Sequence, residues 1–408
     1  MMSCSLSLVP WAVALPPAGA LPLLAGLLVG HAVLVISCHN QWYGTLLSRT
    51  GVHIAQALHA LLLFGGPVAL LLYLRGLDPW PLFAWPPAGP FAALVSLYAA
   101  TCAATGLVAF PLATLARALR RRPAVLESNH TRTVDVAAEL GFRPAGQGSR
   151  RRWALAALLP GNEIFQVDLA VRTLLLPRLP PAWDGLSILH LSDLHFCGTP
   201  DRPFFDHVMR ECALWDPDVV AFTGDLIDDD YLLRWVVPVL GRLKAREGAF
   251  AILGNHDLYH DPPRIRRRLG KAGLDVLGNG WKEVRVRGER LVVIGHEGPW
   301  FPPGPDLAGC PEGVFRLCLS HTPDHMPWAR RQGIDLMLAG HVHGGQIRLP
   351  GVGAVVLPSR HGRRYDCGVF HEPPTVLHVS RGLGSKQPLR YHCRPEVTKL
   401  VLRRADGP

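Results

Sequence analysis

The first 120 residues of this 408-residue chain contain very little charge. No Asp, Glu, Lys or Arg occurs in three long segments, residues 10–36, 54–74 and 91–116. Each is long enough to cross the hydrocarbon core of a bilayer, which takes about 20 residues as a helix. Three such segments close together disfavour the alternative, buried helices of a water-soluble domain. The sequence therefore predicts an all-α membrane region with three transmembrane helices.

The sequence also lacks a pattern of paired cysteines and the positively charged N-terminal segment of a secretory signal peptide. The nine Cys include no Cys-x-x-Cys motif, and their odd number excludes complete pairing, so there is no disulfide framework. This pattern is typical of a reduced compartment. Residues 1–9 contain no Lys or Arg, which makes them a poor secretory signal.

Basic residues near the segment ends predict the orientation of the chain. Arg117, Arg120, Arg121 and Arg122 directly follow the third segment, whereas the loop after the second offers only Arg75 against Asp78. Cytoplasmic loops carry the excess of Lys and Arg. We therefore expect an integral membrane protein whose later residues, after 116, are cytoplasmic.

Five short polar clusters occur after residue 180, each directly after an apolar run that favours a strand buried on both faces. The first three clusters are separated by about one strand–helix–strand unit, roughly 30 residues. Parallel strands would bring them to one sheet edge, where open α/β sheets bind ligands. The runs are residues 187–192, 218–223, 249–253, 315–319 and 335–339. The clusters are Asp193-Leu-His195, Gly224-Asp225-Leu-Ile-Asp228, Gly254-Asn255-His256-Asp257, Ser320-His321-Thr322 and Gly340-His341-Val-His343.

The residue types in these clusters suit divalent transition metals. Imidazole and carboxylate ligands fit Mn, Fe or Zn, and no Cys stands among the candidate ligands. Cys197, two residues after His195, is close in sequence but is not counted as a ligand. The glycines of the clusters either allow a close backbone approach or simply mark strand ends.

Residues from about Leu179 to Arg403 resemble the calcineurin-like metallophosphoesterase superfamily. The patterns Asp-x-His, Gly-Asp-x-x-Asp, Gly-Asn-His-Asp, His and Gly-His-x-His are complete and in order. Residues 340–350, 380–385 and 388–390 are similar to the membrane-associated bacterial YkuE-like branch. The resemblance implies an α/β fold, a metallophosphoesterase β-sandwich flanked by helices, here preceded by the all-α transmembrane region.

The resemblance also implies a role for each residue of the clusters. His256 would protonate the leaving oxygen and would be oriented by Asp228. Asp225 would bridge two divalent metal ions. The implied ligands of one ion are Asp193, His195, Asp225 and His343, and those of the other are Asp225, Asn255, His321 and His341.

Three regions follow from these observations. We expect a membrane domain at residues 1–122, a connecting region at 123–180 and a metallophosphoesterase domain at 181–403. In the connecting region, the basic residues 150–152 and the short apolar segment 154–159 fit an interfacial segment, or equally an ordinary linker helix.

The expected function is that of a membrane-anchored, metal-dependent hydrolase of a phosphodiester or pyrophosphate bond. A lipid-linked substrate, of the UDP-diacylglucosamine type or a phospholipid, suits an active site held near the bilayer. Two alternatives remain: an anchored enzyme for soluble substrates, and a membrane transporter or sensor with a regulatory phosphoesterase module. The sequence does not select among substrates.

The net charge of +10 has two readings. The basic segment from Arg264 to Lys271 lacks interleaved aromatic residues, which disfavours nucleic acid. It suits an anionic membrane surface, or is a solvated helix face. His39, His53 and His59 lie in or near the apolar segments, where we expect polar contacts between helices.

Overall fold

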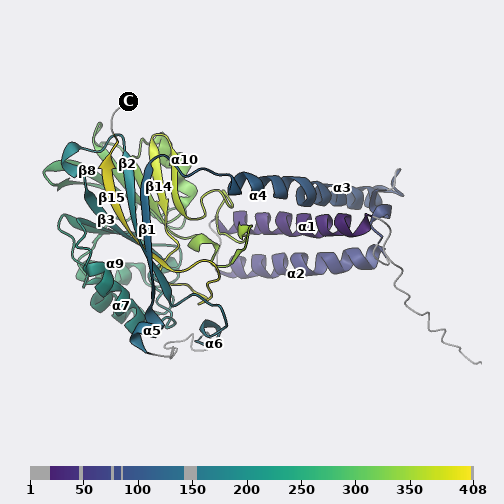
Figure 1. The fold of residues 1–408 in the computed structure, drawn as a ribbon, viewed down its shortest axis with the longest axis horizontal. Coiled ribbons are helices and arrows are strands. Elements are labelled where there is room, and N and C mark those ends of the chain that lie inside the picture. Colours follow the sequence, from purple (N-terminus) through teal and green to yellow (C-terminus); the bar gives the residue numbers. More distant parts are fainter. Residues whose placement is uncertain (1–18, 46–48, 75–77, 84–85, 142–153, 406–408) are drawn as a thin grey trace, which may run out of the picture. The chain divides into compact units, whose positions relative to one another are not determined.

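The computed structural model of the chain describes residues 19–45, 49–74, 78–83, 86–141 and 154–405 (Figure 1). The chain divides into two compact units. The helical unit contains residues 1–39 and 47–120, and the sheet unit contains residues 40–46 and 121–408.

The helical unit confirms the three predicted apolar helices. Its segments 20–42, 50–74 and 90–118 are each long and apolar enough to cross a membrane. Residues 10–18 of the first expected segment lie outside the described residues. The helices are α1 (Ala20–Tyr43), α2 (Arg49–Leu74), and a third helix in which α3 (Pro90–Ala104) continues through a π-helical stretch (Thr105–Ala109) into α4 (Phe110–Ala118).

Glycines let the first and third helices touch along their backbones. Gly26 and Gly30 lie four residues apart and so share one face of α1. A Cβ atom on Gly30 would lie 1.8 Å from the Cys102 carbonyl oxygen, and one on Gly106 would lie 1.9 Å from the Gly26 carbonyl oxygen. Small residues allow such close approach in membrane helix pairs. This packing therefore depends on the absence of side chains at three positions.

A buried histidine connects all three helices. His31 of α1 places Nε2 2.9 Å from the Leu62 carbonyl oxygen of α2 and Nδ1 2.7 Å from the Tyr98 hydroxyl of α3. Since a carbonyl only accepts, Nε2 donates and Nδ1 accepts from the tyrosine. A Cβ atom on Gly66 would lie 2.7 Å from His31 Cε1, so a glycine is needed where the ring meets α2.

The sheet unit contains two large sheets and a small one. The seven-stranded sheet has the order β1-β2-β15-β3-β4-β5-β6, and the six-stranded sheet has the order β13-β14-β10-β9-β8-β7. Strands of the first are β1 (Leu126–Asp135), β2 (Gln166–Leu176), β3 (Leu186–Leu191), β4 (Val219–Phe222), β5 (Gly248–Ala251), β6 (Asp275–Val276) and β15 (Glu396–Arg404). Strands of the second are β7 (Trp281–Val286), β8 (Glu289–His296), β9 (Phe315–Ser320), β10 (Leu336–Ala339), β13 (Gly368–Glu372) and β14 (Thr375–Val379). The third sheet pairs β11 (Arg348–Leu349) with β12 (Gly353–Ala354).

Each large sheet has a parallel centre. Strands β3 to β6 run parallel, as do β8, β9, β10 and β14. All five predicted strands are found, as β3, β4, β5, β9 and β10, with ends within two residues of those expected. Their side chains are nearly all buried, which explains why they read as continuous apolar runs.

The two sheets pack face to face with helices outside them. Ile188 and Val219 of the first sheet share one core with Leu317 and Leu338 of the second. Leu189 and Leu191, which alternate with Ile188 along β3, face the other way and pack under the outer helices. These helices are α5 (Val136–Leu140), α7 (Arg202–Ala213), α8 (Val236–Leu240) and α9 (Pro262–Lys271) on the first sheet, and α10 (Met326–Arg331) on the second (Figure 1). The fold is therefore the expected β-sandwich flanked by helices.

Residues 123–180, expected to form a connecting region, instead supply two strands of the seven-stranded sheet. β1 pairs antiparallel with β2, and β2 pairs parallel with β15. β1 is a polar edge strand, whose residues are largely exposed, so it lacks the apolar pattern that identifies a strand. Of the expected 154–159 segment only Ala154–Ala157 is helical (α6), and residues 150–153 lie outside the described residues.

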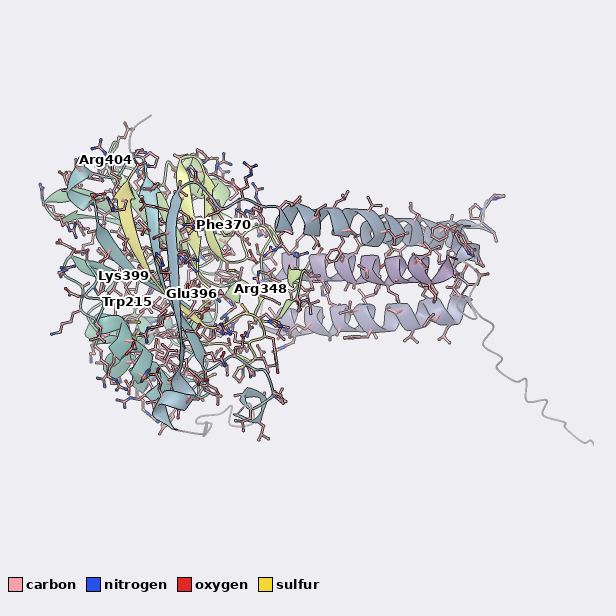
Figure 2. The ribbon with its side chains drawn as sticks, in the orientation of Figure 1. Trp215, Arg348, Phe370, Glu396, Lys399 and Arg404 are labelled. Carbon is pink, nitrogen blue, oxygen red and sulfur yellow. The ribbon has the colours of Figure 1, made fainter. Side chains whose placement is uncertain are left out.

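A side chain of β15 links the seven-stranded sheet to α7, one of the helices that cover it. Lys399 of β15 donates from Nζ to the Trp215 carbonyl oxygen, 2.9 Å away, just after α7 (Figure 2). Within the seven-stranded sheet, β15 itself lies between β2 and β3.

We expect Gly30→Ala to destabilise the helical unit, because the added methyl group would collide with the Cys102 backbone. Overpacking of this kind costs roughly 1–3 kcal/mol. Thermal unfolding of the detergent-solubilised protein measures the effect. Gly65→Ala is the matched control, since a Cβ there meets only Leu61 at 3.6 Å. Equal unfolding midpoints for the two variants would contradict the close helix contact.

Candidate metal centre

The five polar clusters meet where the parallel strands of both sheets end. Three of them follow β3, β4 and β5 of the first sheet, and two follow β9 and β10 of the second. Of the nine residues named as site residues, the structure brings six into two compact groups, and a seventh, His256, forms a third group that overlaps them through His195 and Asp225. These seven are Asp193, His195, His343, Asp225, His256, His321 and His341.

The first group contains Asp193, His195 and His343. Asp193 Oδ1 lies 3.4 Å from His343 Nε2 and 3.8 Å from His195 Nε2, and the two Nε2 atoms are 3.0 Å apart. Nitrogen and oxygen atoms this close together are near enough to share one cation.

The second group contains Asp225, His321 and His341. Asp225 Oδ1 lies 3.4 Å from His321 Nε2, and Asn255 Oδ1 lies 3.0 Å from the same nitrogen. Asp225 Oδ2 is 3.5 Å from His195 Nε2 of the first group. One carboxylate therefore presents an oxygen to each group, which is the placement that a bridging ligand needs.

A buried nitrogen without a partner supports the cation assignment. His341 Nε2 is shielded from solvent and makes no hydrogen bond within the described residues. Buried polar atoms are almost always paired, so an orphan of this kind indicates a missing ion or water. The donor set therefore fits divalent metal ions.

Outer partners orient two of the histidines for metal binding. His195 Nδ1 lies 2.9 Å from Asp228 Oδ2, and His321 Nδ1 lies 2.7 Å from the Thr223 carbonyl oxygen. Because these oxygens accept, a ring proton sits on Nδ1, so Nε2 faces the site and can bind a metal once its own proton is lost. His343 differs, since its Nδ1 lies 3.1 Å from Arg390 Nη2, which can only donate. Ligation through Nε2 would move the ring proton to Nδ1, and this contact would then have to lengthen.

His256 lies beside both groups and shares Asp228 with His195. Its Nδ1 is 2.6 Å from Asp228 Oδ1, and its backbone N–H donates to Asp225 Oδ1 at 2.8 Å. His256 is more exposed than His195, whose side chain is 1% exposed against 19%. Its ring is also close enough to His195 and Asp225 to join a metal group. Geometry alone therefore allows His256 to be an acid or a ligand.

The negative charges of the site are partly balanced by histidine protons when no metal is bound. Burial opposes ionisation of Asp225, but His321, His256 and His195 hold its pKa well below the usual range. Burial also disfavours charged imidazoles, yet Asp228, Asp193 and Asp225 raise the pKa of His195 to about 10. Asp225 and Asp193 likewise outweigh burial and raise the pKa of His321 to about 9. Metal binding must displace these protons.

The backbone at the site is held in an uncommon conformation. Asp193, His195, Asp225, His341 and His343 all have positive φ, between 43° and 70°. For residues other than glycine this region is sparsely populated and clusters at functional sites. Gly254 is needed beside them, because a Cβ atom there would lie 2.2 Å from Asp225 Oδ1. Of the two roles expected for the cluster glycines, Gly254 therefore has the first, which is to allow a close backbone approach.

Asp257 holds two of the loops together. Its fully buried carboxylate accepts backbone N–H groups from Asp225, Leu226 and Gly254 at 2.9–3.0 Å, and a fourth from Ile227 at 3.3 Å. The loop after β4 therefore depends on a side chain from the loop after β5.

Several neighbours of the site were not predicted. Trp300, after β8, is buried, and its ring centroid lies 4.7 Å from that of His341, in a tilted contact, and 5.3 Å from that of His321, in an edge contact. Arg390 is fully buried and donates to the carbonyl oxygens of Arg381 and Gly384, at 2.8 and 2.6 Å. Arg390 fell within a segment of the family resemblance, whereas Trp300 has no pattern around it. Cys197 is not directed at the metal groups, since Sγ donates to the Thr199 carbonyl oxygen at 3.3 Å.

Comparisons with known proteins agree with this geometry. A model of the calcineurin-like phosphoesterase family matches residues 186–345. The chain is 30% identical over 250 residues to the uncharacterized metallophosphoesterase YkuE of Bacillus subtilis, covering 59% of this chain and 87% of YkuE. It is 33% identical over 224 residues to the phosphodiesterase YaeI of Escherichia coli, covering 53% and 81%. It is 29% identical over 260 residues to a transmembrane protein with metallophosphoesterase domain of Bos taurus, covering 58% and 57%.

We expect Asp225→Asn to lose most bound metal and most hydrolytic activity, since one of its oxygens serves each group. His256→Gln should keep its metal but turn over slowly, most of all on substrates with poor leaving groups. Metal analysis and turnover of purified variants measure both effects. Asp306→Asn and His371→Gln, outside the site, are the controls. Two retained ions and a normal rate in Asp225→Asn would refute the bridging role, and a lost ion in His256→Gln would make His256 a ligand.

Proposed function

Because the chain belongs to the calcineurin-like phosphoesterase family, we propose that it hydrolyses a phosphodiester or pyrophosphate bond of a lipid-linked substrate at a two-metal site. The family and the phosphodiesterase relative already make it a metal-dependent phosphoester hydrolase. The three apolar helices and the transmembrane relative make it a membrane protein. The observation that carries the two-metal proposal is the position of Asp225 between the two ligand groups.

Each group of side chains would hold one divalent ion, with Mn, Fe and Zn all suited to these donors. When bound, the pair of ions stabilises the charge on the entering and leaving oxygens of an in-line displacement. The ligands of the first ion would be Asp193, His195, Asp225 and His343, and those of the second Asp225, Asn255, His321 and His341.

His256 would donate the proton that the leaving oxygen takes up. Its Nδ1 is bonded to Asp228 Oδ1, so the proton available to a substrate is on Nε2. A histidine suits this task because it exchanges its proton near neutral pH. Asp228 would orient the ring through this hydrogen bond. The same carboxylate fixes His195, so the acid and a metal ligand are aligned by one residue.

Membrane attachment supports a lipid-linked substrate. A bilayer concentrates amphiphilic phosphates in its headgroup layer, where an anchored enzyme meets them. In the sheet unit, Arg264, Arg267, Arg268 and Lys271 of α9 line a hollow of about 220 Å³, which we call the α9 basic patch. Basic residues near an anionic membrane contribute about 1 kcal/mol each. Arg266, expected in the same cluster, instead pairs with Glu297.

The α9 basic patch fits phosphate headgroups better than nucleic acid. No aromatic residue lines the hollow on which bases could stack. Arg267 and Arg268 each lie three or four residues from Arg264 and from Lys271, so the four cations share one helix face.

The catalytic residues would lie on the cytoplasmic side. Arg117, Arg120, Arg121 and Arg122 follow the last apolar helix, and cytoplasmic loops carry such an excess. The reduced cysteines of the sheet unit suit the same compartment.

We expect the joint replacement of Arg117, Arg120, Arg121 and Arg122 by Asn to weaken the cytoplasmic orientation, because the positive charge that sets it is removed. A reporter inserted after residue 125 of the full-length chain measures the orientation of parent and variant. Replacing Arg264, Arg267, Arg268 and Lys271 by Asn removes the same charge elsewhere and should leave the orientation unchanged. A parent fusion active only on the outer side would disprove this topology.

For the substrate, we expect a higher kcat/KM on an acylated phosphodiester or pyrophosphate in mixed micelles than on its deacylated counterpart, with the detergent-solubilised protein and added Mn. Arg267→Glu with Lys271→Glu should lower kcat/KM for the acylated substrate in anionic micelles and leave the deacylated value unchanged. Arg210→Glu, on an exposed part of α7, is the control. Equal kcat/KM for the two substrates would favour an anchored enzyme for soluble esters.

A further inference from the structure

A series of buried polar side chains runs across the sandwich and ends at Asp193. It begins at Arg172 of β2 and continues through His378 of β14, His190 of β3, Thr223 after β4 and Ser192 after β3. Arg172 is 7% exposed and the others are completely buried. We call these five residues the buried hydrogen-bond path. Polar groups cost free energy inside a core unless each is paired.

Every neighbouring pair along the buried hydrogen-bond path is within hydrogen-bonding distance. Arg172 Nη1 lies 2.5 Å from His378 Nε2, and His378 Nδ1 lies 2.7 Å from His190 Nδ1. His190 Nε2 lies 3.0 Å from Thr223 Oγ1, which lies 2.7 Å from Ser192 Oγ. Ser192 Oγ in turn donates to Asp193 Oδ2.

Arg172 sets the direction of all these hydrogen bonds. A guanidinium only donates, so His378 Nε2 accepts and its ring proton is on Nδ1. His378 therefore donates to His190 Nδ1, which leaves the proton of His190 on Nε2, facing Thr223. The threonine hydroxyl receives that bond and gives its own proton to Ser192, since its other acceptor, the Leu191 carbonyl oxygen, is 3.5 Å away.

The two histidines are neutral, as this order requires. Burial lowers the pKa of His190 to about 4. Burial and the Arg172 charge hold the pKa of His378 well below its usual range.

The start of the path is itself fixed by ion pairs. Arg172 Nη2 lies 2.7 Å from Glu396 Oε2, and Arg381 Nε lies 3.0 Å from the same oxygen. Arg381 Nη2 also lies 2.9 Å from Asp168 Oδ2. Two arginines and two carboxylates thus balance one another, and Arg172 has little freedom to turn away from His378.

The end of the path occupies one oxygen of Asp193. Oδ2 accepts from Ser192 Oγ, and the His341 backbone N–H is shared between Oδ2 at 3.0 Å and Oδ1 at 3.1 Å. Oδ1 is the oxygen closest to His343 Nε2 and His195 Nε2.

We propose that His378, His190, Thr223 and Ser192 are positioning residues which, ordered by Arg172, hold Asp193 Oδ2 and turn Oδ1 toward the first metal. The inference rests on the proposed two-metal function, because it assigns Asp193 as a ligand. The residues do not touch substrate or metal. They act through Asp193, whose carboxylate would otherwise turn or bind with both oxygens. Outer partners of this kind typically change metal affinity by about 10- to 100-fold when lost.

Thr223→Val interrupts the path at nearly constant shape. Valine has no hydroxyl, so His190 loses its acceptor and Ser192 loses a donor, while the Thr223 carbonyl that binds His321 remains. Thr223→Ser restores the hydroxyl. Thr375→Val is the matched control, since Thr375 is equally buried and its hydroxyl bonds to the Ile334 carbonyl oxygen, outside the path.

Isothermal titration calorimetry of the metal-free, full-length protein with Mn²⁺ measures the Kd of each site. We expect Thr223→Val to raise the Kd of one site by about 10- to 100-fold and leave the other unchanged. Thr223→Ser should bind like the parent, and Thr375→Val should lower only the thermal midpoint. Ser192→Ala breaks the path at its last bond and gives a second test if Thr223→Val does not fold.

The results separate this inference from the function on which it rests. Parent-like Kd values for both sites in Thr223→Val and Ser192→Ala would overturn the positioning role and leave the two-metal function intact. The same loss of affinity in Thr375→Val would also overturn it, because the effect would then follow from general destabilisation. A parent protein that binds no Mn²⁺ would overturn the proposed function together with the inference.

Discussion

The structure of the site depends on gathering three carboxylates and several imidazoles in a buried space. Asp193, Asp225 and Asp228 are almost completely buried, and like charges at such distances repel strongly when water is excluded. The metal-free site holds together because His195 and His321 are protonated beside them. The loops that carry these groups contain residues with positive φ, and the Asp257 carboxylate holds two of the loops together through hydrogen bonds to their backbone. Stability of these loops and metal binding are therefore coupled.

The sandwich provides the means of assembling these groups. Each large sheet ends its parallel strands at the same edge, so side chains far apart in sequence meet without long loops. Because the proposed metal ligands follow strands of both sheets, the site is sensitive to how the sheets are aligned. The buried hydrogen-bond path crosses between β3 and β14, and the shared apolar core fills the rest of the interface. A shift of one sheet relative to the other would therefore also disturb the hydrogen bonds that orient Asp193.

Some features of the molecule could be read from the sequence and others could not. The apolar helices and the five buried strands have strong local patterns, and each metal-binding cluster directly follows a strand, so proximity could be inferred. β1 could not be found, because an exposed edge strand such as residues 128–133 carries no apolar alternation. Gly26, Gly30 and Gly106 escaped notice, since their role exists only where two helices cross. His190 and His378 are isolated in sequence, and only strand pairing brings them together.

The protons of the metal-free site also explain why it suits an anionic substrate once it is loaded. Before loading, the carboxylates of Asp193, Asp225 and Asp228 outnumber the protonated rings of His195 and His321 by one charge. Two divalent ions bring four positive charges and displace the two ring protons, so these same side chains and their ions would become positive by one charge. Loading with two such ions would thus change the sign of the site and favour the approach of a phosphoryl group. The exchange also makes metal affinity fall as pH decreases, because protons compete for the Nε2 positions that the ions require.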